Sequence, residues 1–331
     1  MGTDDTIKEN REGFVMKRTQ KTFFSLILAA VMLICTALPA LAAAKTEQTE
    51  MPYENSEFFE YNELSIHYRV FKAENEKAKI FMIHGFAMSG ACWTRLASRL
   101  ANEGYTCVTA DLPDFGYSSR ENADSAMYPR EEVMHALMEE LSKGEKWFVA
   151  GHSMGGYIAL ALAEKYPESV KNLMLFGTAC NTGKPQQLNN MMTNKAFISV
   201  MAPLMELAAR FDFMVKLVLA AALCDSDYLR GYPLGEVTSP LRIKGTGEGA
   251  LRSFAVLPET NLDAVKTMPP ILYMNGDRDF VIPEKERTLL RQYLPDGSTD
   301  ITVKGGGHLF IENKAEETAS AVIAFITGTN R

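Results

Sequence analysis

GHSMGG, at residues 151–156, places a serine among glycines directly after the apolar run KWFVA and directly before YIALALAEKY. This order predicts a strand, a tight turn and a helix. Small residues in such a turn avoid a steric clash, but the G-x-S-x-G pattern is also typical of a turn that presents a nucleophilic serine. Because five residues can match by chance, a catalytic role for Ser153 requires a base, an acid and an oxyanion site elsewhere in the chain.

Strands and helices alternate on both sides of this turn, with short apolar runs ending in glycine and longer amphipathic segments between them. The expected strands are 63–71, 78–85, 105–112, 146–151, 170–177, 269–276 and 299–305. The expected helices are 92–104, 130–144, 154–166, 283–294 and 315–327. We expect the polar residues 45–62 to form a leader before the first of these strands. The alternation predicts an α/β fold with a mostly parallel central sheet flanked by helices.

The alternation stops after Gly177, and residues 180–258 contain no clear buried strand. They include a helical stretch at 194–224 that is rich in Met, Phe and Leu but is interrupted by proline and charged residues too often to span a membrane. We therefore expect one α/β core in two parts, 45–179 and 259–331, with a helical insertion, 180–258, between them. The insertion either packs its own core or forms a cap over a site that favours apolar substrates.

The N-terminal 44 residues have the features of a secretory signal peptide. A basic stretch, an apolar stretch, a proline and an alanine-rich exit follow one another at 16–21, 23–38, 39 and 40–44. This order is typical of an exported or cell-envelope protein, and the alternative is an uncleaved anchor, since 23–44 could just span a bilayer. Acidic residues before Met16 suit a signal poorly, so either Met1 or Met16 is the true start.

The charge and cysteine content exclude two classes of protein. The 331 residues include 34 basic and 41 acidic side chains, which gives a net charge of −7. A mildly acidic sequence without a basic block does not predict a nucleic-acid partner. The cysteines of the mature chain lack C-x-x-C spacing and nearby histidines, so we expect no metal site. Export permits a disulfide among them, although scattered cysteines in a large domain are typically buried thiols. They are Cys92, Cys107, Cys180 and Cys224.

A serine nucleophile needs a base, and among the five histidines His308 has the best position. It follows a predicted strand and three glycines in VKGGGHLF, where functional side chains of an open α/β sheet collect. His67 and His135 lie within a regular strand and a regular helix, so we expect structural roles for both. His152 adjoins the serine, but neighbouring side chains of a sharp turn point apart, and His84 shapes a loop.

The base in turn needs a carboxylate that orients it and stabilises its cation. NGDRDFVIP offers Asp277 and Asp279 directly after a predicted strand, and the residues themselves leave both open. The oxyanion site needs two backbone N–H groups. One is expected from Met154, the residue after the serine, and the other from Phe86 in the loop HGFAMSG.

These motifs together resemble the α/β-hydrolase family, which includes lid-bearing esterases, lipases, carbon–carbon bond hydrolases and haloperoxidase-like enzymes. Ser153 and His308 match the family's nucleophile and histidine, and the order Ser, Asp, His agrees with it. The resemblance selects Asp279 over Asp277, because the family's acid stands three residues after the glycine and four before the proline of GDRDFVIP. It covers roughly residues 62–328, and Asp114 in DLPDFGYSS departs from it where glycine is usual.

The resemblance implies a serine hydrolase that cleaves a carboxylic ester or thioester of a small or medium apolar substrate through an acyl-enzyme. It implies neither cofactor nor metal, and it leaves the oligomeric state open. Two alternatives remain. The first is carbon–carbon bond hydrolysis or perhydrolysis with the same triad. The second is a non-catalytic protein that binds a small-molecule ligand.

Overall fold

A computed structural model describes residues 52–121, 125–183 and 194–329 of the chain. The predicted signal peptide or anchor, 1–44, and both possible start residues lie outside the described residues. No helix of the described ranges is long and apolar enough to cross a membrane.

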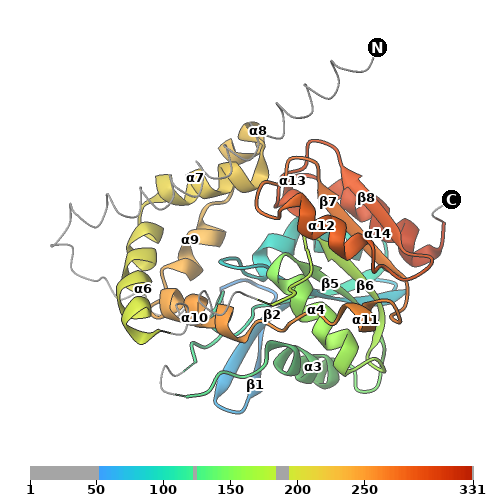
Figure 1. Ribbon diagram of the computed structural model, residues 1–331, viewed down its shortest axis with the longest axis horizontal. Helices are drawn as coiled ribbons and strands as arrows, with labels where there is room; N and C mark the ends of the chain where they lie inside the picture. The colour runs from blue at the N-terminus through green and yellow to red at the C-terminus, as the bar shows by residue number, and fades with distance from the viewer. Residues whose placement is uncertain (1–51, 122–124, 184–193, 330–331) are drawn as a thin grey trace. The chain divides into compact units, whose positions relative to one another are not determined.

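Eight strands form one sheet in the order β1-β2-β4-β3-β5-β6-β7-β8 (Figure 1). The two pairings of β2, with β1 and with β4, are antiparallel, and all the others are parallel. This confirms the predicted fold class. The strands are β1 (Ser56–Tyr61), β2 (Leu64–Phe71), β3 (Ala78–Ile83), β4 (Tyr105–Ala110), β5 (Trp147–His152), β6 (Val170–Phe176), β7 (Ile271–Gly276) and β8 (Thr299–Val303).

One strand was not expected from the sequence. Residues 56–61 were assigned to a polar leader, but they form β1, which pairs with β2 along its whole length, from Ser56 with Arg69 to Tyr61 with Leu64. The charged Glu57 and Glu60 conceal its pattern, because an edge strand with one exposed face tolerates charges that a central strand does not. The assignment of residues 45–62 as a leader was therefore wrong for this part.

Helices cover both faces of the sheet, which explains why every residue of β4, β5 and β7 is buried and why these strands read as continuous apolar runs. Residues of α3, α4 and α12 pack in the core on one face, and residues of η1, α2, α13 and α14 pack in the core on the other. The helices of the core are η1 (Gly90–Trp93), α2 (Thr94–Asn102), α3 (Arg130–Leu141), α4 (Met154–Lys165), α11 (Leu262–Val265), α12 (Glu284–Arg291), α13 (Phe310–Asn313) and α14 (Ala315–Thr327).

Between β6 and β7 the described chain is helical, as the missing strand pattern predicts. Figure 1 shows α6, α7, α9 and α10 grouped on one side of the sheet. The described elements of the insertion are α6 (Lys195–Ala209), α7 (Asp212–Leu223), α8 (Ser226–Arg230), α9 (Gly235–Leu241), α10 (Thr246–Ser253) and η2 (Phe254–Val256). The parallel strands place their carboxyl ends at one edge of the sheet, so the residues after β3, β5, β7 and β8 meet there.

The departure at Asp114 has a structural explanation. Asp114 adopts a φ of 73°, which Asp tolerates better than most residues, and its side chain is fully buried. Its carboxylate pairs with the Arg130 guanidinium at 2.7 Å, and Arg130 also reaches Glu121 at 2.7 Å. Arg130 donates a further hydrogen bond to Ser253 of α10, so the aspartate ties this turn of the core to the insertion.

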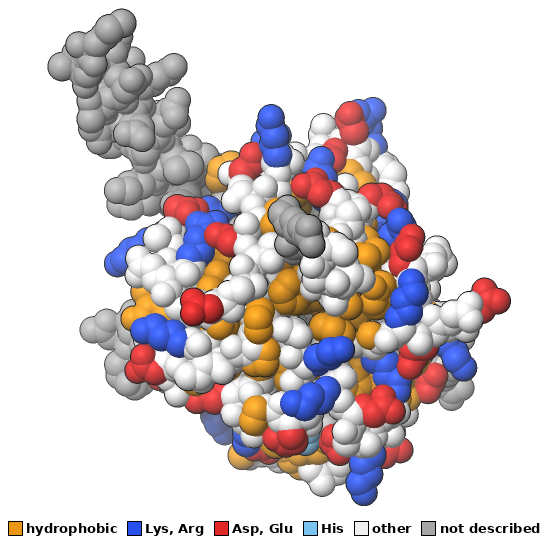
Figure 2. Space-filling model, turned by 90° about the vertical axis from the view of Figure 1, so that its right-hand side faces the viewer, with side chains coloured by type: hydrophobic (Ala, Val, Ile, Leu, Met, Phe, Trp, Pro, Cys, Tyr) orange, Lys and Arg blue, Asp and Glu red, His pale blue; other side chains and the backbone are white. Residues whose placement is uncertain are grey.

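The outer surface of the core carries mixed charges. On the face drawn in Figure 2, basic and acidic side chains alternate among hydrophobic ones, and neither sign forms a continuous area. This arrangement agrees with the net charge of −7 and offers no positive track for a phosphate backbone on that face.

A buried carboxyl group joins α13 to the insertion. Glu312 is 7% exposed and accepts hydrogen bonds from the Tyr232 hydroxyl at 2.8 Å and the Tyr228 hydroxyl at 3.4 Å. Burial raises the pKa of Glu312 to about 8, and the nearby Glu236 carboxylate acts in the same direction, whereas the two tyrosine hydroxyls and Arg95 oppose it. The folded protein therefore keeps a proton that the unfolded chain releases at lower pH.

Glu312→Gln tests this linkage. The contribution of Glu312 to the free energy of unfolding is full below its ordinary pKa and is lost as the pH rises toward about 8. Glutamine keeps an uncharged acceptor for Tyr232, so we expect similar thermal midpoints at about pH 5 and a midpoint several degrees above wild type at about pH 9, since each kcal/mol corresponds to roughly 2–4 °C in a large domain. Thermal unfolding followed by circular dichroism measures both, and the same pH dependence in the two proteins would contradict the assignment.

Candidate active site

Ser153 occupies the turn between β5 and α4 with φ 53° and ψ −117°. A positive φ at a non-glycine residue costs on the order of 1–3 kcal/mol and persists only where the surroundings impose it. Gly155 shows how closely they pack, because a Cβ there would stand 2.2 Å from the Ile83 carbonyl oxygen at the end of β3. The glycine pattern of GHSMGG therefore reflects close approach of the helix to the sheet.

The backbone of Ser153 is fixed, whereas its hydroxyl is not. The Ser153 N–H donates to the Phe176 carbonyl at 3.0 Å, and the Thr178 hydroxyl donates to the Ser153 carbonyl at 3.0 Å. The side chain is half-buried, and its hydroxyl has no hydrogen-bond partner among the residues that the structure describes. The turn thus holds a rigid main chain and leaves the oxygen available to a substrate and a base.

Asp279 and His308 are brought together at the ends of β7 and β8. The Asp279 Oδ2 atom lies 2.9 Å from His308 Nδ1, and Oδ1 accepts the N–H groups of Val281 and Ile282 at 2.8 and 3.1 Å. Burial works against the charged carboxylate, but His308 and these N–H groups outweigh it and hold the pKa of Asp279 below its ordinary value. An ionised Asp279 accepts the Nδ1 proton, so Nε2 keeps its lone pair and can act as a base.

Asp277, the alternative acid, lies differently. Its carboxylate is exposed and accepts the Gly305 N–H at 2.7 Å, so it closes the turn between β7 and the glycine-rich loop. The two aspartates are two residues apart, yet only Asp279 contacts the imidazole of His308.

Ser153, which follows β5, and His308, which follows β8, both lie next to the carboxyl end of β6. A Cβ built on Gly177, the residue after β6, would stand 3.4 Å from His308 Nδ1, and Ser153 donates its N–H to Phe176, the last residue of that strand. No hydrogen bond joins the serine hydroxyl to the imidazole in the described chain. Catalytic hydrogen bonds of a free enzyme are often formed only when substrate is bound, so the predicted pairing of Ser153 with His308 does not require this bond in the free protein.

Two backbone N–H groups flank the serine. Neither the Phe86 nor the Met154 N–H donates a hydrogen bond within the described residues, and Met154 begins α4, where the helix dipole adds positive potential. The loop that carries Phe86 touches the nucleophile, because a Cβ on Gly85 would stand 3.1 Å from Ser153 Cβ. An oxyanion site needs two such N–H groups, so the oxyanion role of Phe86 and Met154 stays a prediction that this geometry allows.

The remaining histidines have structural partners. His84 is fully buried, accepts the Leu112 N–H at 3.0 Å, and has a pKa lowered by burial. His135 stacks on Tyr166 with ring centroids 3.7 Å apart. His152 points away from Ser153, as expected for adjacent residues of a sharp turn, and lies near the main chain of His308.

A second Ser–His–Asp array was not found from the sequence. His67 lies 2.8 Å from the Ser56 hydroxyl through Nε2 and 2.7 Å from the Asp111 carboxylate through Nδ1. All three side chains are at most 3% exposed, so no substrate reaches this serine. Asp111 also accepts two backbone N–H groups, from Gly90 and Tyr117. The array braces β1 and β2 against the loop after β4, and a serine, histidine and aspartate in line are therefore no proof of catalysis.

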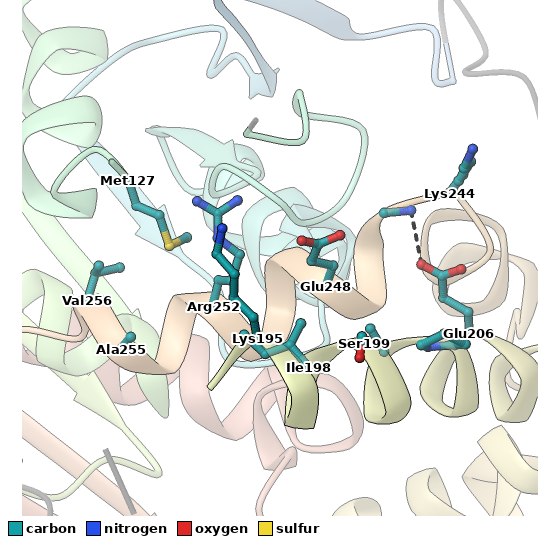
Figure 3. A pocket seen from close by; sticks show the side chains of 13 residues that line it. Met127, Lys195, Ile198, Ser199, Glu206, Lys244, Glu248, Arg252, Ala255 and Val256 are labelled. Atoms are coloured by element: carbon teal, nitrogen blue, oxygen red, sulfur yellow. Dashed lines mark hydrogen bonds between the residues drawn. The ribbon is translucent and has the colours of Figure 1, made fainter. Parts of the chain in front are cut away.

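A cavity of about 690 Å³ lies in the insertion, between α6 and α10 (Figure 3). Its wall combines apolar residues such as Ile198 and Val256 with charged residues such as Lys195, Glu248 and Arg252. None of the predicted catalytic residues lines it. Phe254 directly precedes the cavity residues Ala255 and Val256, and its ring packs on Phe86 of the predicted oxyanion loop with ring centroids 4.4 Å apart.

The side chains that bind metals are not clustered. Within the described residues there is no group of three or more His, Cys, Asp or Glu side chains that could hold a metal ion. Cys92, Cys107 and Cys180 are buried free thiols, and Cys224 is a partly exposed one.

Comparisons with known proteins agree with this architecture. Lipase 3 of Moraxella sp. is 26% identical to this chain over 321 residues, which cover 91% of this chain and 95% of the relative. Two solved structures are also similar. A thermophilic esterase from Thermogutta terrifontis has a TM-score of 0.63 and 19% identity over 81% of this chain and 95% of its own. An enol-lactonase from Burkholderia xenovorans has a TM-score of 0.64 and 19% identity over 82% of this chain and 100% of its own.

The two solved structures support the fold, and a family comparison identifies it. The model of the alpha/beta hydrolase fold matches residues 80–315, which is well over half of the chain and includes every predicted catalytic residue. The chain belongs to the alpha/beta hydrolase fold family.

Proposed function

We propose that this protein is a serine hydrolase that cleaves carboxylic esters or thioesters through an acyl-enzyme. The observation that carries the proposal is the buried Asp279–His308 pair at 2.9 Å, at the same edge of the sheet as a serine whose hydroxyl has no partner in the described chain. The likeness to a lipase over nearly the whole length of both chains also favours ester hydrolysis.

The first half of the reaction transfers the acyl group to the enzyme. The Ser153 oxygen attacks the carbonyl carbon while His308 Nε2 takes its proton, and Asp279 stabilises the imidazolium through Nδ1. The N–H groups of Phe86 and Met154 receive the oxyanion. The carbon–oxygen or carbon–sulfur bond then breaks, the proton on Nε2 passes to the leaving group, and the acyl group stays on Ser153. In the second half, His308 activates water, which releases the acid by the same route.

We assign the apolar part of the substrate to the cavity between α6 and α10, so that the helical insertion acts as a cap. Its volume of about 690 Å³ falls within the range of ordinary ligand pockets. The contact between Phe254 and Phe86 supports this assignment, because Phe254 directly precedes two residues of the cavity wall and Phe86 lies in the predicted oxyanion loop.

Two other functions remain as alternatives. A carbon–carbon bond hydrolase or perhydrolase would use the same three residues, and a non-catalytic ligand-binding protein would use the cavity alone. The positive φ of Ser153, together with the Asp279–His308 pair at the same edge of the sheet, favours catalysis over binding, because strained backbone clusters at active sites. Ester turnover that depends on Ser153 excludes the binding protein, and competing 1,5-diketone or peroxide substrates test the other two.

Substitution of the two aspartates separates their roles. We expect Asp279→Asn to lower kcat for a short-chain nitrophenyl ester by about 10⁴-fold, because an amide favours the wrong imidazole tautomer. Asp277→Asn should change kcat less than about threefold, because its exposed carboxylate accepts the Gly305 N–H and does not contact the imidazole of His308 in the described chain. Steady-state kinetics of the two purified variants measures this, with circular dichroism as the control for folding.

Ser153→Ala is the reference in the same experiment. It should abolish both turnover and labelling by a fluorophosphonate probe, and mass spectrometry should map the label in the unmodified protein to Ser153. A folded protein that neither turns over esters nor takes the label would overturn the proposed function. Equal losses in the two aspartate variants would instead leave the nucleophile in place and contradict the assignment of Asp279.

Ser199→Trp tests the cavity. Ser199 lies exposed on the cavity wall, so an indole there shortens the space without disturbing the core. If the indole excludes two methylene groups of a long acyl chain from the cavity, the lost burial costs about 1.6 kcal/mol. We therefore expect kcat/KM for a dodecanoate ester to fall more than tenfold, whereas kcat/KM for an acetate ester should stay unchanged. Val200→Trp is the matched control, because Val200 is 61% exposed and does not line the cavity. An equal effect on both esters would place the acyl chain elsewhere.

We also propose that the protein is exported by cleavage of its N-terminal segment, on the evidence of the sequence alone. The intact mass and the N-terminal residue of the protein secreted by a bacterial host test this. Cleavage after Ala42 or Ala44 is expected, and a membrane-bound product that retains residues 16–44 would support an anchor instead.

A further inference from the structure

His152 is a buried polar residue that the proposed mechanism does not use. It is 1% exposed, at the end of β5 directly before Ser153, and its ring lies edge-on to Trp93. Its Nε2 atom stands 2.9 Å from the main-chain carbonyl oxygen of His308, 156 residues away in the chain. A carbonyl only accepts hydrogen bonds, so Nε2 carries the proton and donates it.

The other ring nitrogen has no such partner. His152 Nδ1 is buried and makes no hydrogen bond with any residue that the structure describes. A buried acceptor without a partner lowers stability, so an apolar side chain would suit this place better if packing were the only requirement. The main-chain contact through Nε2 is the feature of His152 that such a side chain lacks.

The surroundings leave room for both imidazoles. A Cβ on Gly85 would stand 2.9 Å from His152 Nδ1, and a Cβ on Gly177 would stand 3.1 Å from the His308 carbonyl oxygen and 3.5 Å from His152 Nε2. The two rings lie 4.9 Å apart at an angle of 50°. Glycines at the ends of β3 and β6 therefore form the slot in which one histidine reaches the backbone of the other.

We propose that His152 is a positioning residue, whose Nε2–H holds the main chain of His308 so that the imidazole of His308 faces Asp279 and Ser153 together. This inference rests on the proposed function. Gly305, Gly306 and Gly307 precede His308, and glycine restricts the backbone little by itself, so contacts with neighbouring segments must fix the main chain of His308. Within the described residues, the contact with His152 is the one made to the carbonyl group of His308 itself. A displacement of about 1 Å at a catalytic group is enough to lower a rate by about 100-fold.

The protonation state of His152 suits this role. Burial lowers the pKa of His152 to about 3, and the nearby His308 acts in the same direction, whereas the hydrogen bond to the His308 carbonyl and the Asp279 charge oppose it. His152 is therefore neutral wherever His308 works as a base. His84, which is itself buried and has a lowered pKa, acts on the pKa of His152 in the same direction as His308. The imidazolium formed at His308 meets no second positive charge at 4.9 Å.

Substituting His152 with glutamine or with asparagine distinguishes the roles of its two ring nitrogens, because the two side chains carry the same amide group at different distances from the backbone. His152→Gln places an N–H group close to the position of Nε2 and keeps the donor to the His308 carbonyl. His152→Asn places its amide near Nδ1 and loses that donor. We expect kcat of the Asn variant to fall about 10–100-fold with KM changed less than threefold, and kcat of the Gln variant to stay within about threefold of wild type. The rate of fluorophosphonate labelling at Ser153 should follow kcat.

The NMR chemical shift of the proton between His308 and Asp279 reports on this hydrogen bond, and a loss of packing elsewhere would not change it. The far-downfield signal of this proton should be retained in His152→Gln and shifted or broadened in folded His152→Asn. Wild-type kcat in a folded Asn variant, or a 100-fold loss in a folded Gln variant, would overturn the proposal. If the Asn variant does not fold, the kcat of the Gln variant alone tests the proposal, and a 100-fold loss in that variant would again overturn it. Failure of the proposed function has another signature, because the unsubstituted protein would then neither turn over esters nor label at Ser153.

Discussion

The close packing of α4 on the end of β3 is the constraint on which the site depends. The backbone at Gly155 approaches Ile83 so closely that a Cβ there would stand 2.2 Å from the Ile83 carbonyl oxygen. This contact sets where the helix begins and forces the preceding residue, Ser153, to a φ of 53°. Burial of β5 and of one side of α4 offsets the strain, since every residue of that strand is buried. The nucleophile and the Met154 N–H are therefore aimed by packing of the core.

Asp279 supplies the negative charge next to the imidazole of His308. Asp279 is buried but supported by His308 and two backbone N–H groups, which keeps it ionised. The other imidazoles nearby, His84 and His152, are held neutral by burial, and each keeps one proton that it donates to a carbonyl oxygen. When His308 takes a proton from Ser153, the new positive charge faces a single negative charge in a poorly solvated site, where such a pair interacts strongly.

Periodicity predicted the architecture well where strands are buried on both faces, and it failed at the edge. β2 to β8 all appear as expected, whereas Glu57 and Glu60 concealed β1. The residues alone could not separate Asp277 from Asp279, since both follow β7 and only the three-dimensional path of the chain brings one of them to His308. His152 could be excluded as a base from its place in the turn, but its contact with His308 joins residues too far apart for any local pattern to indicate.

The insertion supports the base as well as covering the core. Leu309, directly after His308, donates its N–H to the Ala222 carbonyl of α7 at 2.9 Å, and Glu312 of the same segment accepts the Tyr232 hydroxyl at 2.8 Å. His308, the predicted base, is thus held from one side by Asp279 and His152, and the segment that follows it is held from the other side by the helices of the insertion. A movement of α7 would shift the backbone of Leu309 and, through it, that of His308. The alignment of the predicted base therefore depends on contacts with the insertion as well as on Asp279.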